Sequence, residues 1–176
     1  MWKSILLAAV VPICTAQAGV RDVSASMMPL AGFEANRLLG HWFEVASTAN
    51  FLEQDCHATT AEVALRDDSR LTLKIACHKI SVSGPILPLE GVMVQTDPAT
   101  FEVRLVKLSE LGNLHLVVLW QAEDDTVAAI GSPEGQIGWI WSKSAHPQAA
   151  ALEQAKAALV KAGYQGRAIK PVEQAP

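Results

Sequence analysis

The sequence is organised around Leu38-Leu39-Gly40-His41-Trp42-Phe43-Glu44-Val45, a Gly-x-Trp motif that opens an alternating apolar and polar run. Gly40 allows the chain to turn sharply into a strand without a side-chain clash. Trp42 then places the largest apolar side chain where a β-barrel needs a plug. A tryptophan in this place is most often ordinary core, so the motif gains its meaning from the strands that follow it.

The composition bounds the number of domains and the class of partner. The chain has 176 residues, of which 50% are hydrophobic and 18% charged, which suits one globular domain and leaves no room for a second. We expect residues 33–176 to form this domain and residues 19–32 to be an extended lead-in. A formal net charge of −4 without basic clusters argues against a nucleic-acid partner.

Residues 1–18 have the pattern of a secretory signal peptide. Lys3 precedes an apolar run at 5–11, which is too short to span a bilayer, and Ala16-Gln17-Ala18 forms an A-x-A cleavage site. The sequence therefore predicts a secreted protein. The alternative is a lipid-anchored form through Cys14, but the residue before this cysteine is not small, as such processing requires.

Two cysteines, Cys56 and Cys77, remain after the signal peptide, and His57 and His78 directly follow them. Two Cys-His pairs could suggest a metal site. Adjacent residues on a strand point to opposite faces, however, so the four groups could not easily converge on one ion. We therefore predict a disulfide in an oxidising compartment, with no metal and no cofactor.

Short alternating segments separated by turn signals predict eight strands. Their expected ranges are 40–48, 57–65, 71–78, 89–96, 101–107, 114–121, 126–131 and 137–143. The connections are too short for parallel crossovers, so the sheet should be antiparallel and up-and-down.

The period changes only after the eighth strand. An amphipathic helix is predicted at 147–162, with its apolar stripe on the outside of the sheet, and a final edge strand at 166–172. The predicted fold is all-β: an eight-stranded antiparallel up-and-down β-barrel with one C-terminal α-helix packed outside.

From about Phe33 to the C-terminus, this ordered set of elements resembles the bacterial lipocalins related to apolipoprotein D. The strongest pieces of the resemblance are residues 39–46, 60–68 and 139–143. Cys56 and Cys77 fall where many relatives carry a disulfide. The resemblance implies a calyx-shaped barrel in the periplasm.

Two departures from the family pattern stand out. The family usually has an arginine stacked over the Gly-x-Trp tryptophan, and here that place holds Lys143, which can still form a cation-π contact with Trp42. The family's Asp-Tyr motif is also missing, because residues 121–125 contain acids but no tyrosine.

Alternation anchored on Trp42, on the family pattern, predicts an inward-facing set that lines a ligand cavity. It comprises Glu44, Ala46, Thr59, Ala61, Val63, Met93, Val103, Leu105, Leu116, Val118, Trp120, Trp139 and Trp141. Gly40, Trp42 and Lys143 should close the barrel base. The alternative is that the inward tryptophans pack a solid core. A buried Glu44 needs a partner, which we expect to be Lys143 or the polar head of a ligand.

The resemblance implies a carrier of a small hydrophobic ligand, such as a fatty acid or a lysophospholipid. An alternative is a lipocalin-like enzyme, for example an isomerase, in which Glu44 would act with His57 or His78. The sequence contains no nucleophile elbow, metal-ligand spacing or phosphate loop to favour it, and we predict no catalytic residue.

A third hypothesis is a filled barrel that binds another protein, or a membrane, through its loops. The apolar pairs Phe51-Leu52 and Ile86-Leu87 are then the expected contact surface, or alternatively a lid. The sequence predicts no particular oligomeric state.

Overall fold

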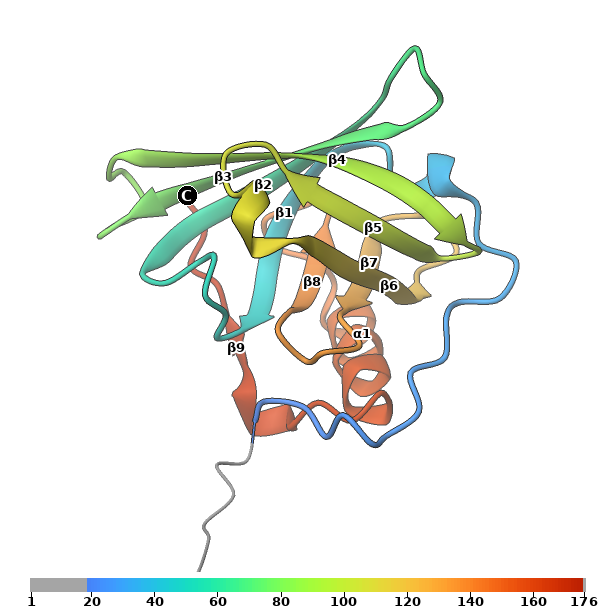
Figure 1. Cartoon of the computed structure of the whole chain (residues 1–176). Helices are drawn as coiled ribbons and strands as arrows, with labels where there is room; N and C mark the ends of the chain where they lie inside the picture. The colour runs from blue at the N-terminus through green and yellow to red at the C-terminus, as the bar shows by residue number, and fades with distance from the viewer. Residues whose placement is uncertain (1–18, 176) are drawn as a thin grey trace, which may run out of the picture.

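Eight antiparallel strands close into a barrel in the computed structural model, which describes residues 19–175 (Figure 1). The strands are β1 (Gly40–Thr48), β2 (Cys56–Leu65), β3 (Leu71–Lys79), β4 (Ile86–Asp97), β5 (Thr100–Leu105), β6 (Asn113–Gln121), β7 (Val127–Gly131) and β8 (Gly138–Ser142). Each strand pairs with the next, and β1 pairs with both β2 and β8, which closes the barrel. The predicted fold class is confirmed. The predicted signal peptide and Cys14 lie outside the described residues.

Strand β4 begins earlier than predicted, and Pro88 therefore lies within it. The proline pairs with Ala76 of β3, whereas the pairing with β5 begins only at Gly91. Proline cannot donate a hydrogen bond, so it is tolerated on the stretch of β4 that β5 leaves uncovered. The strand predicted at 89–96 therefore extends back through the proline to Ile86.

Helix α1 (Ala149–Lys161) packs outside the barrel, as predicted. Its alanine-rich sequence favours a helix, and Gly163, at φ +97°, ends it in the left-handed conformation. Ala155 and Leu159 are fully buried against β7 and β8, where they form an outer core with Val127 and other apolar side chains. No helix of residues 19–175 is long and apolar enough to span a membrane.

Three 3-10 helices and a short ninth strand are the remaining elements of the described chain. The 3-10 helix η1 (Ala35–Leu38) leads into β1, and η2 (Ser109–Leu111) precedes β6. After α1, η3 (Gly166–Ala168) leads to the short strand β9 (Ile169–Pro171), which pairs with the end of β1. The predicted final strand is thus present but shorter than expected.

The lead-in at 19–32 is held by a buried arginine. The Arg21 guanidinium donates hydrogen bonds to the carbonyl oxygens of Ala162 (2.8 Å), Pro133 (2.7 Å) and Ala25 (2.7 Å). Arg21 also forms a β-bridge with Tyr164, so the lead-in is fastened to the segment that follows α1.

The predicted disulfide between Cys56 and Cys77 is confirmed and links β2 to β3. We expect the double variant Cys56→Ser/Cys77→Ser to lose about 3 kcal/mol of unfolding free energy, because the bridge closes a loop of about 21 residues. Urea denaturation followed by circular dichroism measures this loss. Wild-type protein treated with a reductant is the matched control and should show the same loss. An unchanged midpoint in the double variant would contradict the prediction.

Candidate functional site

The base of the barrel is closed where the predicted residues Gly40, Trp42 and Lys143 come together. The Trp42 indole Nε1 donates to the Leu38 carbonyl oxygen at 2.7 Å. The Lys143 ammonium lies 3.7 Å from the centre of the Trp42 ring and donates to the Leu39 carbonyl oxygen at 2.8 Å. Gly40, at φ +97°, leaves room for this ammonium. Burial lowers the pKa of Lys143 from its ordinary value.

A second set of contacts fastens η1 to the turn between β6 and β7. Arg37 forms an ion pair with Asp125 at 2.6 Å and donates to the Ala122 carbonyl oxygen at 3.1 Å. Gln121 donates back to the Arg37 carbonyl oxygen at 3.0 Å. These contacts occupy the turn where the Asp-Tyr motif is missing, and they hold η1 across the base.

Lysine at position 143 is expected to stabilise the base. We predict that Lys143→Met lowers the unfolding free energy by about 1 kcal/mol, since it removes a cation-π contact and a hydrogen bond. Lys143→Arg is the control, because it keeps the charge over the ring. Thermal unfolding of the three proteins tests this, and a Lys143→Met variant as stable as wild type would contradict it.

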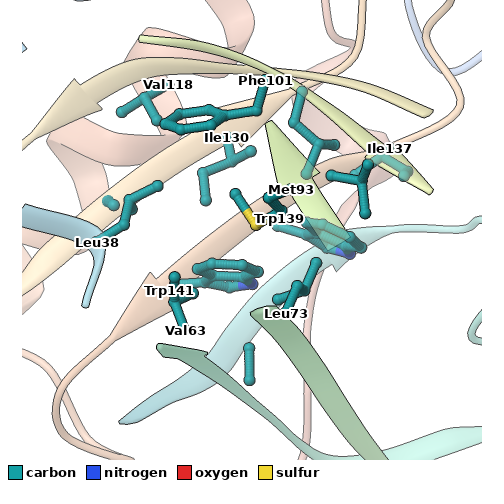
Figure 2. Close-up of a cluster of buried hydrophobic side chains, with 14 of the residues drawn as sticks. Leu38, Val63, Leu73, Met93, Phe101, Val118, Ile130, Ile137, Trp139 and Trp141 are labelled. Atoms are coloured by element: carbon teal, nitrogen blue, oxygen red, sulfur yellow. The ribbon is translucent and has the colours of Figure 1, made fainter. Parts of the chain in front are cut away.

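Most of the predicted inward-facing residues lie inside the barrel (Figure 2). The members of the inner core among them are Ala61, Val63, Met93, Val103, Leu105, Leu116, Val118, Trp139 and Trp141. Trp141 lies between Trp42 and Trp139, with ring centres at 6.3 and 5.4 Å respectively. These side chains, together with Phe101 and Leu73, fill much of the interior. The assignment of the inward set as ligand contacts stays a prediction.

Ala46 and Trp120 are exceptions, because both belong to the outer core rather than the interior. The β1–β8 register shifts between Glu44 and Ala46, and the β6–β7 register shifts between Val118 and Trp120. A β-bulge adds one residue to a strand and so reverses the alternation beyond it. The inward orientation predicted for these two residues is therefore wrong. Trp120 instead lines an outer groove of about 850 Å³ beside the start of α1.

The mouth of the barrel is covered by the β1–β2 connection, residues 49–55, which we call the mouth loop. Leu52 is only 6% exposed and belongs to the inner core, whereas Phe51 is 43% exposed. The Asn50 Oδ1 accepts from the backbone N–H groups of Leu52 (3.0 Å) and Glu53 (3.1 Å). Phe51 and Leu52 are the apolar pair that the sequence analysis singled out in this loop. Only Leu52 of the two enters the barrel.

Glu53 joins the mouth loop to the barrel wall. Its Oε2 accepts from the Trp139 indole Nε1 at 2.8 Å and from the Asn50 Nδ2 at 2.6 Å. Sequence reasoning missed this residue. The only local signal was the Asn50-x-x-Glu53 spacing, which is common in turns and says nothing about a contact with β8.

Glu44 is buried inside the barrel and shares a hydrogen bond with Glu53. Burial raises the pKa of Glu44 well above its ordinary value, and the charge of Glu53 raises that pKa further. A hydrogen bond from Ser47 acts in the opposite direction. The raised pKa favours the protonated form of Glu44, which is the form that can donate to Glu53. Of the two partners expected from the sequence, Lys143 lies at the base, so that pairing was wrong, and the polar head of a ligand stays a prediction.

Two further buried polar side chains flank Glu44. Trp141 is its register partner on β8. Thr59 is its neighbour on β2, because Phe43 pairs with Thr60 and Gln174 donates to the carbonyl oxygens of both Glu44 (2.6 Å) and Thr59 (3.5 Å).

Apart from the proton that Glu44 and Glu53 share, the Thr59 Oγ1, the Trp141 Nε1 and the Glu53 Oε1 are buried without a hydrogen-bond partner among the described residues. Buried polar atoms are normally paired, so their number beside one carboxyl pair indicates a place for a polar group. We call Glu44, Glu53, Thr59, Trp139 and Trp141 the mouth polar cluster.

The histidines considered for acid-base chemistry lie elsewhere. His57 contacts Glu173 at 3.4 Å, and the His78 Nδ1 lies 3.1 Å from the Gly84 carbonyl oxygen. The structure therefore does not bring either histidine to Glu44. Within residues 19–175 there is also no group of three or more side chains suited to hold a metal ion.

Comparison with known proteins agrees with this geometry. The family model of the lipocalin-like domain matches residues 33–174. No curated protein matches the sequence significantly. Lobster apocrustacyanin A1 is similar in structure, with 17% identity, a TM-score of 0.67 and 81% of each chain covered.

Two other solved structures support the same fold. The cockroach allergen Per a 4 is 14% identical, with a TM-score of 0.68 over 88% of this chain and 97% of that one. H1 crustacyanin from the lobster Homarus americanus is 16% identical, with a TM-score of 0.61 over 84% and 90% of the two chains. Such low identities show the fold alone. The family match, which spans most of the chain, shows that this protein belongs to the lipocalin-like domain family.

Proposed function

We propose that this protein binds a small hydrophobic ligand, such as a fatty acid, a lysophospholipid or a molecule of similar shape, inside its barrel. The observation that supports this most is Leu52, which the mouth loop inserts into an apolar interior whose other end is closed by Trp42. An apolar ligand could take the place of this side chain. Proteins of the lipocalin family are mostly non-enzymatic binding proteins, which agrees with this proposal.

The energetics favour an apolar ligand that replaces the inserted side chain. Burial of about 200 Å² of ligand surface contributes roughly 5 kcal/mol at 25 cal/mol per Å². Part of this gain is offset because the mouth loop must be displaced and the ligand immobilised. The loop's contacts with the barrel include the Trp139–Glu53 hydrogen bond and one from Lys79 to the Gln54 carbonyl oxygen, and both are polar contacts that water can replace.

A neutral fluorescent probe tests the proposal independently of the ligand's head group. We expect N-phenyl-1-naphthylamine to bind delipidated protein saturably, and Ala61→Trp, which fills the interior, to weaken binding by at least about tenfold. Ala61→Leu is a milder variant in case the tryptophan prevents folding. Ala64→Trp is the matched control, since Ala64 lies on the same strand but faces solvent. Absence of saturable binding, or equal binding by the Ala61 and Ala64 variants, would contradict the proposal.

We also propose that the protein is exported to the periplasm after cleavage behind Ala18. The Cys56–Cys77 disulfide supports an oxidising compartment. The intact mass of protein from a periplasmic fraction tests this. We expect a chain that begins at Gly19, whereas a lipidated chain that begins at Cys14 would contradict the proposal in favour of an anchored form.

A further inference from the structure

We infer that the mouth polar cluster recognises a ligand whose head is an ammonium group, that is, a protonated amine on an apolar body. This inference rests on the proposed function and names the chemistry of the ligand's head. The protein would then prefer an amine to a fatty acid with the same alkyl chain.

The first argument is the charge of the cluster. Glu44 and Glu53 share one hydrogen bond, and the other contacts of Glu53 are neutral donors from Trp139 and Asn50. Within the described part of the chain, no ion pair joins either carboxyl group to a basic side chain. Glu53 is partly buried and its Oε1 is shielded from solvent, so a negative charge there without a cation carries a desolvation cost that a cationic ligand would reduce.

The surrounding basic groups are engaged elsewhere. Lys79 of β3 donates to the Gln54 carbonyl oxygen on the exposed side of the mouth loop. His57 of β2 contacts Glu173 of the C-terminal segment, and Lys143 beyond β8 donates to the Leu39 carbonyl oxygen at the base. The carboxyl pair is thus faced by neutral groups from β1, β2 and β8: Ser47, Thr59, Trp139 and Trp141.

The second argument is the set of unpartnered atoms, which is independent of charge. Thr59 and Trp141 are each 1% exposed, and they flank Glu44 on the inner wall. The Thr59 Oγ1, a hydroxyl that can accept or donate, has no partner, and apart from the proton shared with Glu44 the Glu53 Oε1 accepts no hydrogen bond from the described residues. Glu44 becomes a third acceptor once it loses its proton. An ammonium group has three N–H donors, a number that matches these three acceptors.

The tryptophans add a further contribution. The rings of Trp139 and Trp141 stack with their planes 21° apart and their centres 5.4 Å apart. Figure 2 shows both tryptophans in the barrel interior, and they adjoin the carboxyl pair because Trp139 donates to Glu53 and Trp141 is the register partner of Glu44. An ammonium near such a ring face gains a cation-π interaction, which strengthens where water is excluded. The unpartnered Trp141 Nε1 gains an acceptor when its neighbour Glu44 ionises. A carboxylate head could bond to this N–H, but it would lie against the charge of Glu53.

Binding should release a proton. The O–H bond of Glu44 breaks, its proton passes to solvent, and the resulting carboxylate accepts hydrogen bonds from the ammonium. Because the amine itself stays protonated well above neutral pH, its affinity should rise with pH, by up to about tenfold per pH unit, until Glu44 is ionised in the free protein. A carboxylate ligand, which leaves Glu44 protonated, should show no such rise with pH.

Isothermal titration calorimetry with three chain-matched ligands tests the inference: decylamine, decanoic acid and decanol. We expect decylamine to bind at least about tenfold more tightly than decanoate at neutral pH and to tighten as pH rises from about 5.5 to 7.5. Titrations in buffers of different ionisation enthalpy should report release of up to about one proton per bound decylamine and no release for decanol.

Two variants locate the effect. Glu44→Gln should abolish proton release and weaken decylamine binding by about tenfold or more, and it should weaken decylamine more than uncharged decanol. Glu53→Gln should also weaken decylamine binding. Glu62→Gln is the matched control, because Glu62 lies exposed on β2, and it should behave as wild type.

Each outcome separates the inference from the proposed function. Decanoate or decanol binding as tightly as decylamine would overturn the ammonium inference and leave the hydrophobic carrier intact. Decylamine affinity that is unchanged in Glu44→Gln would likewise overturn the ammonium inference and leave the hydrophobic carrier intact. If none of the three ligands binds, the proposed function itself fails.

Discussion

Trp42→Ala should lower the free energy of unfolding by about 3–5 kcal/mol, the range seen when a large buried aromatic side chain is removed from a core. Trp42 is fully buried, and its ring supports Lys143 on one side and Trp141 on another. The variant also leaves the Leu38 carbonyl oxygen without its donor. Urea denaturation followed by circular dichroism measures the loss.

Two control variants distinguish the role of Trp42 in closing the barrel base from the general effect of losing a tryptophan. Trp42→Phe keeps a ring under the ammonium and should cost roughly 1–2 kcal/mol, mainly for the lost hydrogen bond. Trp120→Ala should cost less than Trp42→Ala, because Trp120 lies in the outer core and is only partly buried. Equal losses in Trp42→Ala and Trp120→Ala would contradict the assignment of Trp42 as the plug of the barrel base.

Glu44→Gln should make the protein more stable than wild type at neutral pH and should flatten the dependence of stability on pH. The pKa of Glu44 is raised in the folded protein, so the folded state binds more protons than the unfolded state above the ordinary pKa of 4.5. Wild-type stability should therefore fall as pH rises from 4.5 toward the raised pKa, by up to about 1.4 kcal/mol per pH unit. Glutamine keeps the shape and a donor toward Glu53 but does not ionise.

Chemical denaturation at a series of pH values tests this expectation. The matched control is again Glu62→Gln, which should retain the slope of wild type. Exposed acids whose pKa values are lowered, such as Asp68 beside Arg70, affect stability only at more acidic pH. They therefore do not contribute to the pH dependence of stability between pH 4.5 and the raised pKa of Glu44. Wild-type stability that rises over the interval, or a Glu44→Gln variant with the same slope, would contradict a buried protonated Glu44.

Several features of the fold follow from signals that are local in sequence. Alternation with period two and the turn residues between the runs were enough to predict eight antiparallel strands, and the change to a helical period located α1. The disulfide was predicted from the oxidising compartment and because adjacent Cys and His residues on a strand point to opposite faces, and the barrel base of Gly40, Trp42 and Lys143 was predicted from the family pattern.

The mouth polar cluster was predicted only in part. Glu44, Thr59, Trp139 and Trp141 were identified as inward-facing, since each keeps the alternation of its strand. Glu53 was missed, because a loop residue has no periodic signal and its contact with Trp139 joins positions 86 residues apart. Lys143 was wrongly expected to pair with Glu44. The β1–β8 register places Glu44 opposite Trp141, whereas Lys143 lies beyond the end of β8, at the barrel base.

The sequence by itself determined the number of strands, their antiparallel order, the outer helix and the disulfide, because hydrophobic periodicity and chain connectivity leave few other ways to bury this chain. The tertiary structure alone decided the two bulges that turn Ala46 and Trp120 outward, and the closure of the mouth loop that brings Glu53 to Glu44. A bulge adds one residue without any change in composition, so it emerges only when two strands pair. The carboxyl pair likewise exists only once the barrel closes, since its burial and shared proton arise from groups on β1, β8 and a loop.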